Sequence, residues 1–93
     1  MHSIKVEPKS DAEDSYIYEV TLGEAGDTSL HIVSVPTSYW QKLTGGKIDK
    51  AELVRRSFEF LLNREPKESI LNRFELPVIQ SYFKDYEESI TIK

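Results

Sequence analysis

Residues 48–63 read Ile-Asp-Lys-Ala-Glu-Leu-Val-Arg-Arg-Ser-Phe-Glu-Phe-Leu-Leu-Asn, and this stretch predicts the central helix of the fold. Asp49 is a favourable N-cap residue, and Glu52 three positions later completes a capping box. On a helical wheel, one arc is apolar and the opposite arc is charged. The apolar arc comprises Ala51, Leu53, Val54, Phe58, Phe60, Leu61 and Leu62. Because such an arc must be buried against another layer, we expect this helix to form the centre of the core.

Shorter helices are predicted on both sides of the central one. A helix capped by Thr37 or Ser38 runs through Leu43 and ends at Gly45, because glycine readily adopts the left-handed conformation of a helix C-cap. Two prolines each favour the first position of a further helix. The expected apolar sets are Ile70, Leu71 and Phe74 after Pro66, and Ile79, Tyr82, Phe83, Tyr86 and Ile90 after Pro77. The pattern leaves open whether residues 90–92 continue the last helix or form a strand.

The first half of the chain shows the period-two alternation of β-strands. Ile4 and Val6 alternate with polar residues until Pro8 stops the run. Residues 16–22 and 29–35 are rich in β-branched and aromatic side chains, which favour strands. Glycines occur in the connection between these two runs, so the runs predict an antiparallel hairpin.

These elements together predict an α+β fold, in which three or four helices of the C-terminal half cover one face of a small three-stranded antiparallel sheet from the N-terminal half. Ile17 and Ile32 make both faces of the sheet partly apolar, so the pattern leaves open which face packs on the helices. The acidic cluster of Asp11, Glu13 and Asp14 is expected to lie in a solvated connection between the first two strands.

Composition limits the classes of function. The chain has 93 residues, with 12 Lys and Arg against 16 Asp and Glu, and we expect a single domain over residues 1–93. It has no cysteine, which excludes disulfides, thiolate metal sites and thiol catalysis, and we expect no metal, cofactor or catalytic residue. The residues after Met1 are too polar for a signal peptide, and no apolar run reaches the roughly 18 to 20 residues of a membrane helix. We therefore expect a cytoplasmic protein without a membrane partner.

His31 is the one histidine inside a predicted element, and its strand face is shared with valines, which favours a buried imidazole. As a general base it would need an orienting partner, for which Glu19 on the preceding strand is the candidate, and a substrate pocket. The carboxylates Glu65, Glu68 and Glu75 lie near predicted helix boundaries, where the helix dipole stabilises negative charge without any catalytic role.

The most distinctive run of the chain is FEFLLNREP at residues 58–66, followed by SIL at residues 69–71. This run resembles a family of small prokaryotic proteins of unknown function that carry similar Phe-Leu-Leu, Arg-Glu-Pro and Ser-Ile-Leu signatures, over roughly residues 30–90. The resemblance implies no activity, cofactor or catalytic residue. From the residues themselves, we expect a core helix to end, a tight reversal and a second helix, with Arg64 and Glu65 bonding backbone groups at the junction.

The leading functional hypothesis is a non-enzymatic protein-interaction module that self-associates or binds a protein partner. The edges of a small sheet can pair with a partner strand, and five Tyr, four Phe and one Trp exceed what one small core obviously hides. The candidate binding residues combine aromatics near element ends with two arginines on the charged arc, because these residue types are enriched at binding hot spots. They are Tyr39, Trp40, Tyr82, Tyr86, Arg55 and Arg56.

Two alternatives remain. The first is a small-ligand-binding protein or a carboxylate- or His31-dependent enzyme, with a pocket between the sheet and the helices. The second is nucleic-acid binding through the Arg55 and Arg56 face of the central helix. Nucleic acid is disfavoured, because residues 47–73 carry seven basic against five acidic residues and both arginines have glutamates at helical spacing.

Overall fold

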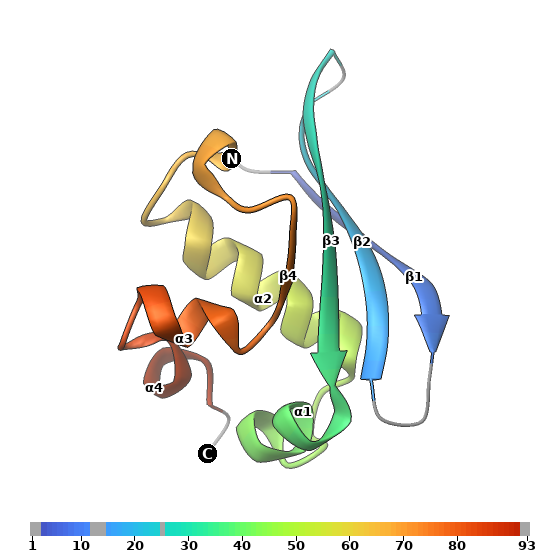
Figure 1. Cartoon of the computed structure of the whole chain (residues 1–93), viewed down its shortest axis with the longest axis vertical. Helices are drawn as coiled ribbons and strands as arrows, with labels where there is room; N and C mark the ends of the chain where they lie inside the picture. The colour runs from blue at the N-terminus through green and yellow to red at the C-terminus, as the bar shows by residue number, and fades with distance from the viewer. Residues whose placement is uncertain (1–2, 12–14, 25, 92–93) are drawn as a thin grey trace.

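The computed structural model describes residues 3–11, 15–24 and 26–91, and over these ranges the chain forms a four-stranded sheet covered on one face by four α-helices (Figure 1). The α+β class is therefore confirmed. The elements in chain order are β1 (Ile4–Asp11), β2 (Ser15–Glu24), β3 (Asp27–Pro36), α1 (Thr37–Thr44), α2 (Lys50–Leu62), the 3-10 turn η1 (Lys67–Ser69), β4 (Arg73–Glu75), α3 (Val78–Tyr82) and α4 (Tyr86–Ile90).

The sheet has the order β1-β2-β3-β4, and the first three strands are antiparallel neighbours as predicted. The prediction of three strands is wrong, because β4 adds a fourth strand parallel to β3, with Phe74 beside Val33. The sequence pattern predicted a helix there. Pro66 starts a single 3-10 turn, and Pro77 disfavours a helical conformation at the residue before it. The segment between them therefore extends and hydrogen-bonds to β3.

The first strand does not stop at Pro8 but continues to Asp11, with a shift of register between Pro8 and Ser10. Proline lacks a backbone donor, and an edge strand tolerates it because one side of the strand needs no ladder bond. Of the acidic cluster predicted in the following connection, Asp11 is instead the last residue of β1, beside Tyr16, and Glu13 and Asp14 lie outside the described residues.

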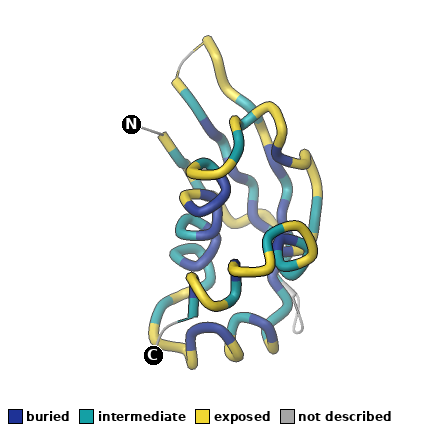
Figure 2. The backbone as a smooth tube through the Cα atoms, turned by 90° about the vertical axis from the view of Figure 1, so that its left-hand side faces the viewer, coloured by how far each residue is buried: buried dark blue, intermediate teal, exposed yellow. Residues whose placement is uncertain are grey.

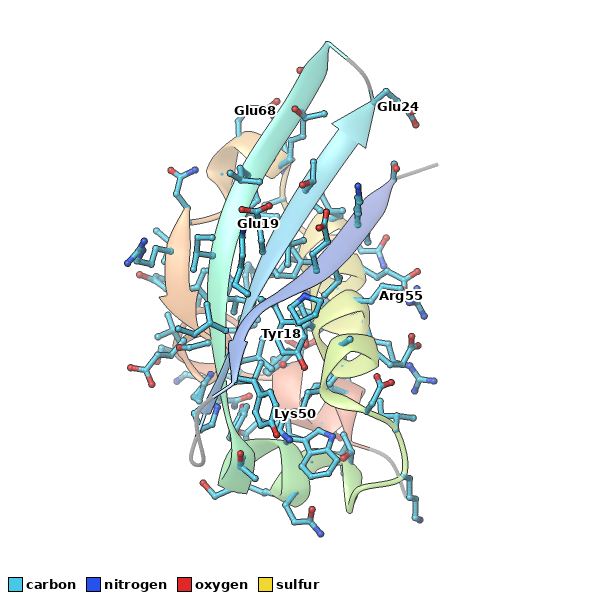
Figure 3. The ribbon with its side chains drawn as sticks, turned by 90° about the vertical axis from the view of Figure 1, so that its right-hand side faces the viewer. Tyr18, Glu19, Glu24, Lys50, Arg55 and Glu68 are labelled. Atoms are coloured by element: carbon cyan, nitrogen blue, oxygen red, sulfur yellow. The ribbon has the colours of Figure 1, made fainter. Side chains whose placement is uncertain are left out.

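The two faces of the sheet differ in environment. The helices cover the face formed by alternate residues of the hairpin, and these side chains are buried: Tyr18, Val20, Leu22, His31, Val33 and Val35. Ile17 and Ile32 lie on the other face, which no described helix covers (Figure 3). The question that the sequence left open is therefore answered by the register of β2 against β3.

Helix α2 packs its apolar arc against the sheet, and Figure 2 shows its buried positions turned toward the strands. Asp49 caps the helix, its Oδ1 accepting from the backbone N–H of Glu52 at 2.8 Å. Helix α1 ends as predicted at Gly45, whose φ of 61° is left-handed. Its start differs from the prediction, because β3 leads into the helix at Pro36, which occupies the N-cap position in place of Thr37 or Ser38.

The C-terminal segment is two short helices instead of one. The backbone is extended at Phe83, whose ring meets Phe60 edge to face with centroids 5.9 Å apart. Gln80 bridges the break, because its Nε2 donates to the carbonyl of Lys84 at 2.7 Å and its Oε1 accepts from the backbone N–H of Glu87 at 2.8 Å. Ile90 belongs to α4, and Ile92 lies outside the described residues.

Candidate docking groove

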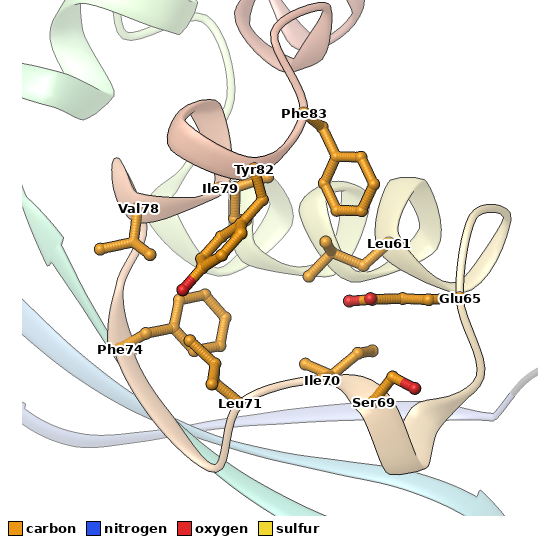
Figure 4. Close-up of a pocket in the computed structure, with 10 residues that line it drawn as sticks. All are labelled: Leu61, Glu65, Ser69, Ile70, Leu71, Phe74, Val78, Ile79, Tyr82 and Phe83. Atoms are coloured by element: carbon orange, nitrogen blue, oxygen red, sulfur yellow. The ribbon is translucent and has the colours of Figure 1, made fainter.

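An apolar groove of about 270 Å³ opens where the C-terminal end of α2, the η1–β4 segment and α3 meet (Figure 4). Its lining residues are Leu61, Glu65, Ser69, Ile70, Leu71, Phe74, Val78, Ile79, Tyr82 and Phe83. All of these residues belong to the C-terminal half of the chain, and we refer to this hollow below as the groove.

The groove holds an unusual share of the exposed apolar surface. Among the described residues, three large apolar side chains are exposed, namely Leu30, Leu71 and Tyr82. Leu71 retains 46% and Tyr82 retains 66% of its accessible surface, and both line the groove. Leu30 lies apart from them, on the uncovered face of the sheet. Apolar side chains that gather around a hollow are typical of binding sites, whereas single exposed ones need no explanation.

His31 is hydrogen-bonded to the backbone of Leu71, one of the residues that line the groove. Its Nδ1 lies 2.7 Å from the carbonyl oxygen of Leu71, which can only accept, so Nδ1 carries a proton. Its Nε2 lies 2.8 Å from Ser29 Oγ, and its ring packs on Phe58 with centroids 5.6 Å apart. The imidazole is therefore a buried, hydrogen-bonded part of the core that anchors the η1–β4 segment to β3.

Glu19 does not orient this histidine. In the hairpin register Glu19 faces Ile32, while His31 faces Val20, so the two side chains lie on opposite faces of the sheet. The Glu19 carboxylate instead pairs with Lys9 Nζ at 3.3 Å. A general base formed by His31 and Glu19 is therefore contradicted by the strand register.

Three polar side chains reach the groove, from Glu65, Ser69 and Tyr82. Within the described part of the chain these side chains make no hydrogen bond to one another or to other groups. Figure 4 shows the Glu65 carboxylate directed into the groove. A nucleophile hydrogen-bonded to a base, as covalent catalysis requires, is not assembled among these three groups.

Two of the predicted binding residues are buried in the core. Tyr86 is fully buried, its hydroxyl lies 2.7 Å from Ser57 Oγ, and burial raises its pKa. Tyr39 is also buried and donates to Glu87 Oε2 at 2.8 Å; burial and then this bond raise the pKa of Tyr39. The same bond, with help from Lys42, lowers the pKa of Glu87. These positions do not fit a binding surface, because the folded chain hides them.

Trp40 is half-buried and is occupied by the chain's own groups. Its Nε1 donates to the carbonyl of Ile48 at 2.8 Å. The ammonium of Lys50 lies 4.1 Å from the centroid of its ring and 3.9 Å from that of Tyr16. The faces of both aromatic rings are therefore contacted by the chain's own ammonium group.

The two arginines of α2 are neutralised by acidic neighbours. Glu52 accepts from Arg55 Nη2 at 2.6 Å and from Arg56 Nε at 2.8 Å, and Arg55 also pairs with Glu59. The hydrogen bonds from Arg55 and then Arg56 lower the pKa of Glu52 to about 2. Arg55 and Arg56 thus form an ion-pair network on the helix surface, which leaves little net positive charge for a phosphate backbone.

Arg64 follows α2 and bonds a backbone group at the junction as predicted, because its Nη1 donates to the carbonyl of Phe60 at 3.5 Å. It also forms an ion pair with Asp85, and its guanidinium lies over the Phe60 ring at 3.7 Å from the centroid. Glu65, paired with it in that prediction, has its backbone N–H bonded to the carbonyl of Leu61, while its carboxylate enters the groove.

Of the predicted binding residues, Tyr82 lines the groove, and the remaining five lie elsewhere. Leu71 and Glu65 were not predicted as binding residues, because Leu71 was expected on a helix and Glu65 at a helix boundary. The signal for Leu71 was its place between Pro66 and Pro77, because a segment bounded by two prolines is a poor place for a long helix.

A second hollow of about 290 Å³ lies near the hairpin tip, between β2 and the segment after α2. Lys67 lines it and is held by two carboxylates, from Asp27 at 3.1 Å and Glu68 at 2.6 Å. Its charged group is thus already compensated within the chain, whereas the carboxylate of the groove is not.

Neither a metal site nor a membrane span emerges from the described residues. They contain no group of three His, Cys, Asp or Glu side chains placed to hold a metal ion. None of their helices is both long and apolar enough to cross a membrane.

The chain matches no protein-family model, no curated protein and no solved structure. The resemblance of residues 58–71 to a prokaryotic family therefore stays a prediction.

Proposed function

We propose that this protein is a non-enzymatic protein-interaction module, and that it docks an apolar side chain of a protein partner in the groove. The observation that carries the proposal is the gathering of Leu71 and Tyr82, both exposed, around an apolar hollow. Burying one large apolar side chain contributes about 1.5–3 kcal/mol, which suits an anchor residue in a protein contact.

The size of the groove suits a single large side chain. Its volume of about 270 Å³ lies at the lower end of the range of small-molecule pockets, roughly 300 to 1,000 Å³. The three polar side chains of the groove are not hydrogen-bonded to one another, so they do not form the nucleophile–base pair of covalent catalysis. The ion pairs of Arg55 and Arg56 with glutamates argue in the same way against nucleic acid.

The proposal is tested by selecting binders from a phage-displayed library of random 12-residue peptides on the immobilised chain. The wild type is compared with Leu71→Gln and with the matched variant Leu30→Gln, since both leucines are exposed and only Leu71 lines the groove. We expect peptides that bind the wild type and Leu30→Gln, and that lose at least tenfold in affinity on Leu71→Gln. Peptides that are insensitive to Leu71→Gln, or no enrichment at all, would contradict the proposal.

Light scattering over a concentration series identifies the source of the partner. A mass of twice 10.8 kDa that returns to 10.8 kDa in Leu71→Gln means that a second copy occupies the groove. A mass of 10.8 kDa at every concentration, together with peptide binding, means that the partner is a different protein.

A further inference from the structure

The carboxylate of Glu65 stands out among the acidic groups of the chain by its surroundings. Glu65 is half-buried where the chain turns away from α2, and its carboxylate points into the groove among apolar side chains (Figure 4). Within the described residues it has no ion pair and no hydrogen-bond donor. A carboxylate at an apolar groove that has no donor within the chain can accept one from a partner, and hydrogen bonds to a charged group are stronger than those between neutral groups.

The neighbouring cations of the chain are committed elsewhere. Arg64 pairs with Asp85 and covers the Phe60 ring. Lys67 forms ion pairs with Asp27 and Glu68 at the second hollow. Neither of these two cations pairs with Glu65 in the described structure, so its carboxylate is available to a positive charge brought by a partner.

We propose that the groove recognises a segment of a partner protein in which a large apolar residue is followed or preceded closely by Lys or Arg, the apolar side chain filling the groove and the cation pairing with Glu65. This inference rests on the proposed function and adds the charge of the partner to it. The whole chain carries a formal net charge of −4, which favours the approach of a basic segment over an acidic one.

The same peptide selection, run on Glu65→Gln and Glu65→Lys, tests the inference. From the wild type we expect enriched peptides with Lys or Arg within about four positions of a large apolar residue. Glu65→Gln should keep the apolar residue and lose the basic one, and Glu65→Lys should enrich Asp or Glu instead. On individual basic peptides, Glu65→Gln should weaken binding about five- to tenfold, and the loss should shrink at high salt.

Glu75→Gln is the matched control, because Glu75 is an exposed carboxylate on the uncovered face of the sheet, outside the groove. It should select the same peptides as the wild type. If the wild type and Glu65→Gln select the same peptides, and Leu71→Gln does not, the charge inference is overturned while the proposed function stands. Selection that is indifferent to Leu71 would overturn both.

Discussion

Two regions of the molecule carry similar residue types: the end where α1 meets α4, and the groove. They differ in whether these side chains are hydrogen-bonded within the chain. Around α1 and α4, Tyr39, Tyr86 and Glu87 are all bonded within the chain. In the groove, Tyr82 and Glu65 offer the same two kinds of group without partners in the described structure. Residue type therefore says little about binding in this protein, and what distinguishes the two regions is whether internal partners satisfy each group.

The largest expected difference is between two tyrosines four positions apart. Tyr86→Ala should lower the free energy of unfolding by about 3–5 kcal/mol, because it empties a fully buried site and removes the hydroxyl that is hydrogen-bonded to Ser57 Oγ. Tyr82→Ala should change it by less than about 0.5 kcal/mol, because Tyr82 is exposed. Urea denaturation of both variants measures the contrast, and equal destabilisation would show that the groove wall is part of the core.

A smaller effect is expected at the link between the core and the groove. His31→Asn should cost about 1–3 kcal/mol, because a shorter side chain cannot reach both Ser29 and the carbonyl of Leu71. It should also accelerate amide hydrogen exchange at Ile32, whose N–H donates to the carbonyl of Asn72 at 2.7 Å. Unchanged exchange at Ile32 would mean that the η1–β4 segment is held without the histidine.

The ion-pair network of α2 should make a pH-dependent contribution to the free energy of unfolding. The pKa of Glu52 is lowered to about 2, so its contribution is complete above its ordinary pKa, near 4.5, and is lost as the pH falls from there toward 2. Because the pair is partly exposed, we expect Glu52→Gln to cost about 0.5–1 kcal/mol at pH 7. Urea denaturation at pH 7 and near pH 2 checks this, with exposed Glu88→Gln as control. A cost that persists at pH 2 would refute the ion-pair account.

An effect of similar size is expected at Lys50, whose ammonium lies between the rings of Tyr16 and Trp40. Lys50→Met keeps the length of the side chain and removes the charge, so it should cost about 0.5–1 kcal/mol through the lost cation–π contacts. Trp40 is the sole tryptophan of the sequence, so a change in its fluorescence reports the same event. An unchanged emission spectrum would show that the ammonium does not rest on the ring in solution.

Much of the fold could be predicted from local pattern, and the groove could not. The capping residue Asp49 and the apolar arc of α2 follow from residues within one helix, as does the glycine that ends α1. The β4 strand was missed because Ile70, Leu71 and Phe74 also fit a helical period, and what extends them is pairing with β3, 40 residues earlier in the chain.

The exposure of binding residues was harder to predict for a related reason. On the single helix that the sequence predicted, Tyr82 and Tyr86 would lie on the same face. In the structure the helix is interrupted at Phe83, so Tyr82 is exposed and Tyr86 is buried. Whether an aromatic is hidden depends on such a break and on partners such as Ser57, which sequence spacing does not reveal.

The parallel pairing of β4 with β3 has a consequence for the order of folding. The chain between β3 and β4 contains α1, α2 and η1, so their pairing requires closure of a long loop, whereas the β2–β3 hairpin and α2 are local. We therefore expect the wall of the groove to be completed late, after the hairpin and the helix are in place. A partner that recognises this surface would pass over newly made or damaged chains and engage mature ones.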